Sequence, residues 1–182
     1  MITPNASPDE LSSPFFLKNE QTCLEWEKFA KDNNGEIQGS YNAWSYKLFL
    51  KIDNPTPWRI VISRATYTSG NLLLSSKYQN RHDQIVIKTK VDSNAEFIIK
   101  KPSFRDFFSG KRMSRLHVNN TYKVLGQSEG EIFNKISVLL SKQFKSKQVF
   151  LVELKKKLLS ITINNANKEF ELIKSLVSSN LE

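Results

Sequence analysis

The chain has 182 residues, of which 39% are hydrophobic, and its 27 lysines and arginines outnumber 18 aspartates and glutamates to give a formal net charge of +9. This length suffices for one domain that buries roughly 70% of its unfolded surface. The positive surplus favours an anionic partner, which the sequence leaves open among nucleic acid, an acidic protein and an anionic membrane surface.

Cys23 is the single cysteine, which excludes an intrachain disulfide and a thiolate metal cluster and indicates a reducing compartment. No apolar run approaches the ~18 residues that span a bilayer. The N-terminus lacks the basic and apolar regions of a secretory signal. We therefore expect a cytoplasmic protein.

The N-terminal residues 1–14 are rich in proline, serine, asparagine and acid, and we expect them to form a mobile tail before a single α+β domain over residues 15–182. A helix is predicted from Asn19 or Glu20, because Cys23, Trp26 and Phe29 recur at helical spacing. The Asn-Asn-Gly sequence at residues 33–35 predicts its end.

The next part of the chain predicts a mainly antiparallel meander sheet over residues 44–101, covered by the N-terminal helix. Residues 39–43 are expected to form a loop. Alternating or apolar runs predict strands at residues 44–52, 58–63, 72–78, 84–91 and 96–100, with turns at 68–71, 80–83 and 92–94. The links between strands are too short for parallel crossovers, so neighbouring strands are expected to be antiparallel.

The rest of the chain predicts a unit of strand, helix, hairpin and helix. The strand falls at residues 121–125 and the first helix at 128–144, with Ser128 and Glu131 at the spacing of a capping box. Residues 149–154 and 158–163 predict a hairpin, and Phe170, Ile173 and Leu176 predict the apolar side of a last helix.

One motif matches a catalytic pattern. Residues 126–130 read Gly-Gln-Ser-Glu-Gly, the nucleophile-elbow pattern, but His82 and His117 both precede Ser128, whereas hydrolases with this elbow carry histidine after the serine. Ser128 also has an ordinary role as a helix cap. The histidines, cysteine and carboxylates show no metal-ligand spacing, and no phosphate-binding loop is present. We expect no catalytic residue, metal or cofactor, and an enzyme with an unrecognised site stays an alternative.

A basic stretch is the best candidate for function. Residues 99–123 contain seven bases and one acid. Cations release counterions from phosphates, and exposed aromatic rings stack on unpaired bases. Two other interpretations stay open. The phenylalanines of this stretch could enter an anionic membrane surface, or they could anchor the stretch to the core while its lysines and arginines are solvated. Lys142, Lys145, Lys147 and the lysines at 155–157 either extend this basic region or solubilise the chain. The candidate binding residues are Lys100, Lys101, Arg105, Phe107, Phe108, Lys111, Arg112 and Arg115.

Three features together carry a resemblance. They are the Trp-x-x-Phe-Ala sequence at residues 26–30, the central meander, and the strand that enters an amphipathic helix over residues 122–140. In these features the chain resembles uncharacterised bacterial α+β domains of unknown function, and the resemblance implies no activity and no site residues. The sequence therefore predicts a non-enzymatic interaction domain that binds an anionic partner, with single-stranded RNA or DNA as one alternative partner.

Overall fold

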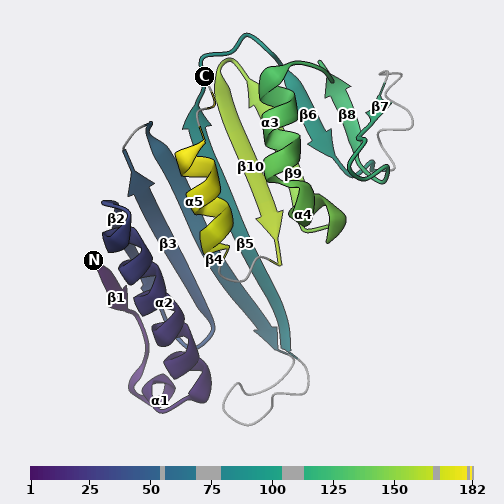
Figure 1. Ribbon diagram of the computed structural model, residues 1–182. Coiled ribbons are helices and arrows are strands. Elements are labelled where there is room, and N and C mark those ends of the chain that lie inside the picture. Colours follow the sequence, from purple (N-terminus) through teal and green to yellow (C-terminus); the bar gives the residue numbers. More distant parts are fainter. Residues whose placement is uncertain (54–55, 69–78, 104–112, 166–168, 180, 182) are drawn as a thin grey trace. The chain divides into compact units, whose positions relative to one another are not determined.

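The computed structural model shows a mixed α+β protein whose strands pair mostly antiparallel, as the sequence predicts (Figure 1). It describes residues 1–53, 56–68, 79–103, 113–165, 169–179 and 181. The predicted strand at 72–78 and the predicted helical turn around Phe104, Phe107 and Phe108 lie outside these residues. By contacts the chain divides into two compact units, Met1–Ile85 and Val86–Glu182. The assignment of residues 15–182 to a single domain stays a prediction.

The first unit begins with two short elements in the stretch where the sequence predicts none. Strand β1 (Ile2–Pro4) pairs in parallel with β2 (Glu36–Tyr41), and helix α1 covers Pro8–Leu11. The backbone N–H of Ile2 donates to Glu27 Oε1 at 3.0 Å. The mobility of residues 1–14 stays a prediction.

Helix α2 (Pro14–Asp32) begins earlier than the predicted start at Asn19 or Glu20. Ser13 supplies the cap, since its side chain accepts a hydrogen bond from the Phe15 N–H at 3.3 Å. Pro14 occupies the first helical turn, where its missing N–H costs nothing. The predicted end is confirmed, with Asn34 in a left-handed conformation at φ 51°.

The predicted loop at residues 39–43 is wrong for residues 39–41, because β2 (Glu36–Tyr41) runs through Gly39 and pairs with β3 (Ser45–Ile52), and only residues 42–44 connect the two strands. A Cβ at Gly39 would lie 2.9 Å from Leu48 Cα and closer still to the Lys47 carbonyl oxygen. Glycine at this position therefore allows the two strand backbones to approach closely.

The strand prediction at residues 44–52 is confirmed by β3, and that at 58–63 by β4 (Trp58–Thr68), its antiparallel neighbour. Leu48, Leu50, Ile60 and Ile62 on the inner face are at most 2% exposed. Helix α2 covers strands β2 and β3 (Figure 1) and buries Trp26 to 1% exposure. The expected helical cover of the sheet is therefore present.

Strand β5 (Gln79–Lys90) includes the residues predicted to form a turn at 80–83, so that prediction is wrong, while the predicted strand at 84–91 is confirmed. The boundary between the units falls within β5, after Ile85. Asp83 faces the interior and pairs with Arg64 of β4. This long-range ion pair stabilises extended backbone where the local residue types favour a turn.

In the second unit the strand order is β5-β10-β9-β6-β8-β7. The hairpin of β9 (Val149–Lys155) and β10 (Leu158–Asn164) confirms its prediction and lies between β5 and β6 (Phe97–Lys100). The predicted meander therefore does not continue from β5 to β6 as neighbouring strands. Strand β8 (Lys123–Gly126), near its predicted place, pairs with β6 and with the short β7 (Ser114–Arg115).

Helices α3 (Glu131–Leu139), α4 (Ser141–Lys145) and α5 (Phe170–Ser178) complete the second unit. Phe97 of β6 meets Phe133 of α3 edge to face, with ring centroids 5.2 Å apart. The single helix predicted at 128–144 is broken at Leu140, and its predicted capping box is absent. Gly130 caps α3 instead, at φ 117°, which delays the helix start.

Candidate functional site

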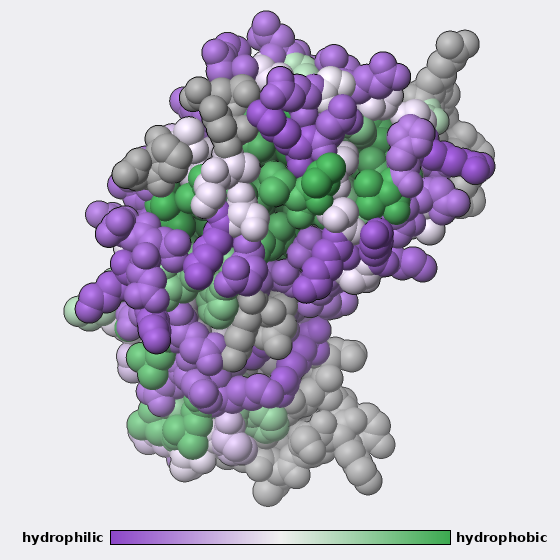
Figure 2. Space-filling model, viewed as in Figure 1, coloured by the Kyte–Doolittle hydropathy of each residue, from purple (hydrophilic) through white to green (hydrophobic). Residues whose placement is uncertain are grey.

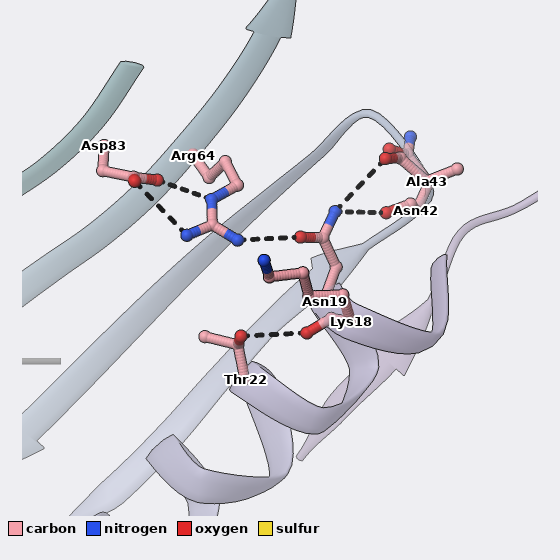
Figure 3. Close-up of polar contacts among 7 residues, drawn as sticks. All are labelled: Lys18, Asn19, Thr22, Asn42, Ala43, Arg64 and Asp83. Carbon is pink, nitrogen blue, oxygen red and sulfur yellow. Dashed lines mark hydrogen bonds and ion pairs between the residues drawn. The ribbon is translucent and has the colours of Figure 1, made fainter. Parts of the chain in front are cut away.

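A buried polar network surrounds Arg64 in the first unit (Figure 3). Arg64 is 5% exposed. Its Nε and Nη2 donate to the two carboxylate oxygens of Asp83 at 2.5 and 3.3 Å, and its Nη1 donates to Asn19 Oδ1 at 3.2 Å. Asn19 Nδ2 in turn donates to the Asn42 and Ala43 carbonyl oxygens at 2.9 and 3.3 Å.

The charges in this network indicate a structural role. Burial lowers the pKa of Arg64, but the hydrogen bond with Asp83 and the neighbouring charges outweigh burial, so that the pKa is raised and the guanidinium stays charged. The Tyr46 ring lies 5.0 Å from the guanidinium carbon. These groups satisfy one another, which favours a role in joining α2 to strands β4 and β5 over a role in catalysis.

Neither of the two nucleophile candidates, Cys23 and Ser128, has the surroundings of an activated nucleophile within the described residues. Cys23 is 2% exposed, as expected of a core residue, and burial, followed by the charge of Glu27, raises its thiol pKa to about 12. Among the described residues no hydrogen bond joins Ser128 to a histidine. The same part of the chain contains no group of three or more histidine, cysteine or acidic side chains placed to hold a metal.

Only part of the predicted basic region falls within the described residues. Lys100 ends β6, Lys101 follows it, and Arg115 lies exposed on β7. Lys100 and Lys101 line one groove in the second unit, and Arg115 is absent from its lining. The positions of Arg105, Phe107, Phe108, Lys111 and Arg112 lie outside the described residues. The basic binding residues as a set therefore stay a prediction.

The groove has a volume of about 560 Å³ and lies along strands β6 and β9. Lys100 and Ile98 alternate along β6 with the buried Phe97 and Ile99, so they point away from α3. Among the described lining residues, three lysines and a single carboxylate, Glu153, contribute the charges. The lining residues are Ile98, Lys100, Lys101, Ser103, Lys147, Gln148, Val149, Phe150, Leu151, Glu153, Asn164 and Asn165.

A contact between two of the lysines shapes one end of this groove. Lys101 Nζ donates to the Lys147 carbonyl oxygen at 2.9 Å and lies 5.7 Å from the centre of the Tyr122 ring. Lys147 follows α4 with a left-handed backbone, φ 59°, and is exposed. In the described part of the chain neither lysine forms an ion pair with a carboxylate.

Phe150 is the groove residue that the sequence analysis missed. The pairing of β9 with β10 shifts between Thr162 and Ile163: Leu151 lies opposite Thr162 and Val149 opposite Ile163, which leaves Phe150 without a partner in a β-bulge. The bulge turns the Phe150 ring outward, and 58% of the residue is exposed. Apolar residues occupy both faces of the strand at residues 149–154, so the sequence there has no alternation from which a bulge could be predicted.

A second hollow in this unit is apolar and shallow. Figure 2 shows the side that carries α3 and α5, where hydrophobic residues form patches between hydrophilic ones. The hollow is lined at α3 by Val138, which is 70% exposed, and by Leu139 and Lys135. Glu131, Asn134 and Ser179 also line it, and Glu131 is paired with Lys135 at 2.8 Å.

The fold and the groove define an α+β protein with a lysine-lined hollow on the strand face opposite α3. No protein-family model, no curated protein and no solved structure matches this chain. The resemblance to uncharacterised bacterial α+β domains stays a prediction. None of the helices in the described ranges is both long and apolar enough to cross a membrane.

Proposed function

We propose that this chain is a non-enzymatic binding protein that engages an anionic partner through the groove along β6 and β9. The observation that carries the proposal is the convergence of Lys100, Lys101 and Lys147 on one hollow, where Glu153 is the single carboxylate among the described lining residues. Lysine ammonium groups bind phosphate oxygens and release condensed counterions. The net charge of +9 adds long-range attraction for the same class of partner.

The test is a salt titration of binding to anionic polymers. Fluorescence anisotropy would compare labelled oligonucleotides and polyphosphate for the parent chain and for the double variant Lys101→Glu, Lys147→Glu. We expect tight binding at low salt that weakens as salt rises. The charge reversals should weaken it by about tenfold or more at a fixed low salt concentration and flatten the dependence on salt.

A matched control separates the groove from the overall charge. Lys28 and Lys31 are exposed on α2, in the first unit, so Lys28→Glu, Lys31→Glu makes the same change in net charge away from the groove. This control should bind nearly as well as the parent. Equal losses in both double variants, or no binding to any anionic polymer at low salt, would reject the proposed function.

A further inference from the structure

Resting on the proposed function, we infer that the partner is a single-stranded nucleic acid, with an unpaired base stacked on Phe150 and backbone phosphates bound by Lys101 and Lys147. The three side chains line the same groove. Single-strand binding surfaces combine cations that follow the backbone with aromatic rings that stack on bases.

The position of Phe150 favours a stacked base over a purely electrostatic ligand. The ring projects from a β-bulge and is 58% exposed, although most of the neighbouring apolar side chains of β9 and β10 are buried. A polyphosphate chain has no apolar face and would leave this ring in water. An unpaired base has a flat apolar face that covers the ring and an edge that stays polar.

Polar side chains in the groove suit the edge of such a base. Gln148, Asn164 and Asn165 contribute amide groups to its lining. Gln148 is held in place, because its Oε1 accepts from Ser146 Oγ at 2.6 Å and its Nε2 donates to the Asn165 carbonyl oxygen at 3.2 Å. Amide groups form hydrogen bonds with the edges of splayed-out bases in single-stranded RNA.

The shape of the site argues against a duplex and against a membrane. In a duplex the bases are stacked within the helix, and the ring could not reach a base face. A membrane surface is entered by side chains that protrude from an apolar face, whereas Phe150 and the lysines line a hollow of about 560 Å³. That volume is in the range, ~300–1,000 Å³, of concave sites for small molecules.

The experiment compares labelled oligo(dT), oligo(rU), a duplex and polyphosphate as ligands of the parent, Phe150→Ala and Phe150→Trp. We expect Phe150→Ala to weaken binding to the single strands about tenfold and to leave polyphosphate binding unchanged, while Phe150→Trp retains single-strand binding. Phe150→Leu, which keeps the apolar bulk without the ring, should behave like Phe150→Ala. Phe49→Ala is the matched control, because Phe49 is an exposed phenylalanine (42%) on β3 of the first unit.

The outcomes separate this inference from the proposed function. If the lysine reversals weaken binding to all anionic polymers but Phe150→Ala and Phe150→Leu change nothing, the stacking inference is wrong and the proposed function stands. Equal affinity for the duplex and the single strands, with no effect of Phe150→Ala, would also overturn it. Vesicles with anionic lipid are the last arm: binding to vesicles that depends on Phe150, without single-strand binding, would assign the groove to membranes instead.

Discussion

Arg64 of β4 and Asp83 of β5 meet through two hydrogen bonds, at 2.5 and 3.3 Å, although 19 positions separate them in the chain. The Arg64 side chain is 5% exposed and the Asp83 side chain 16%. Removal of one partner from a buried ion pair leaves the other charge without compensation, which costs more than the pair itself contributes.

The ion pair predicts a large loss of stability on single substitution. Asp83→Asn should lower the free energy of unfolding by about 3 kcal/mol, because the Arg64 guanidinium then stays buried without its carboxylate. The double variant Arg64→Met, Asp83→Leu removes both charges. Its loss of stability should therefore be smaller than the sum of the losses in the two single variants. Chemical denaturation, followed by a spectroscopic signal from the first unit, measures the free energy of unfolding of each variant.

The control for this prediction is an exposed ion pair. Asp53 lies 2.6 Å from both Lys51 and Arg59, and its side chain is 48% exposed. Asp53→Asn should change the free energy of unfolding far less than Asp83→Asn, because water already screens these charges. Equal effects of the two substitutions would show that the Arg64 pair is not held in a buried environment.

Cys23 predicts a loss of stability at alkaline pH. Its thiol pKa is raised from 9.0 to about 12, chiefly by burial. Above pH 9 the unfolded chain releases this proton while the folded chain keeps it, so the unfolded state binds fewer protons and stability falls as pH rises towards 12. Below pH 9 both states are protonated and the contribution is constant.

The measurement is the free energy of unfolding against pH for the parent and Cys23→Ala, from about pH 8 to about pH 11. In the variant, the free energy of unfolding should fall with rising pH less steeply than in the parent, by up to about 1.4 kcal/mol per pH unit. The pH dependence that remains in the variant comes from groups such as Tyr41. Burial and the hydrogen bond to Glu20 raise the pKa of Tyr41 to about 12. In the folded parent the Cys23 thiol should also react slowly with a thiol reagent. If the free energy of unfolding depends on pH identically in the parent and in Cys23→Ala, the alkaline loss of stability does not come from Cys23.

The β9–β10 hairpin predicts a stabilising substitution. Its turn places Lys156 at φ 49° and Lys157 at φ 63°, left-handed values that lysine adopts at a cost. Asparagine and glycine suit a two-residue turn with positive φ at both positions. Lys156→Asn, Lys157→Gly should therefore raise the free energy of unfolding by about 1–2 kcal/mol, measured by denaturant titration.

Two single substitutions check the cause. Lys156→Asn alone keeps the ion pair of Lys157 with Asp92, at 2.5 Å, and should supply part of the gain. Lys155→Gly, on the adjoining strand residue, should destabilise, because glycine weakens a strand interior. A gain from Lys155→Gly as large as that of the turn variant would show that the effect is not one of turn conformation.

The candidate groove was partly predictable from the sequence. The basic composition at residues 99–123 drew attention to Lys100 and Lys101, and the lysines after the predicted helix included Lys147. Their convergence with Phe150 depends on the pairing of β6 with β9 and on the bulge opposite β10. Neither is a local property of the chain, because strand partners and register are chosen by contacts between distant residues.

Residue alternation predicted β3 and β4, and helical spacing predicted the buried face of α2, because the side on which a side chain lies follows from backbone periodicity within a few residues. Two apolar runs joined by three lysines predicted the β9–β10 hairpin. Tertiary structure decided that β2 passes through Gly39, that a hairpin from the end of the chain lies between β5 and β6, and that Asp83 stays extended to meet Arg64. These features are stabilised by close backbone approach, strand pairing and a buried ion pair between residues far apart in sequence. Such interactions leave no periodic pattern in the sequence.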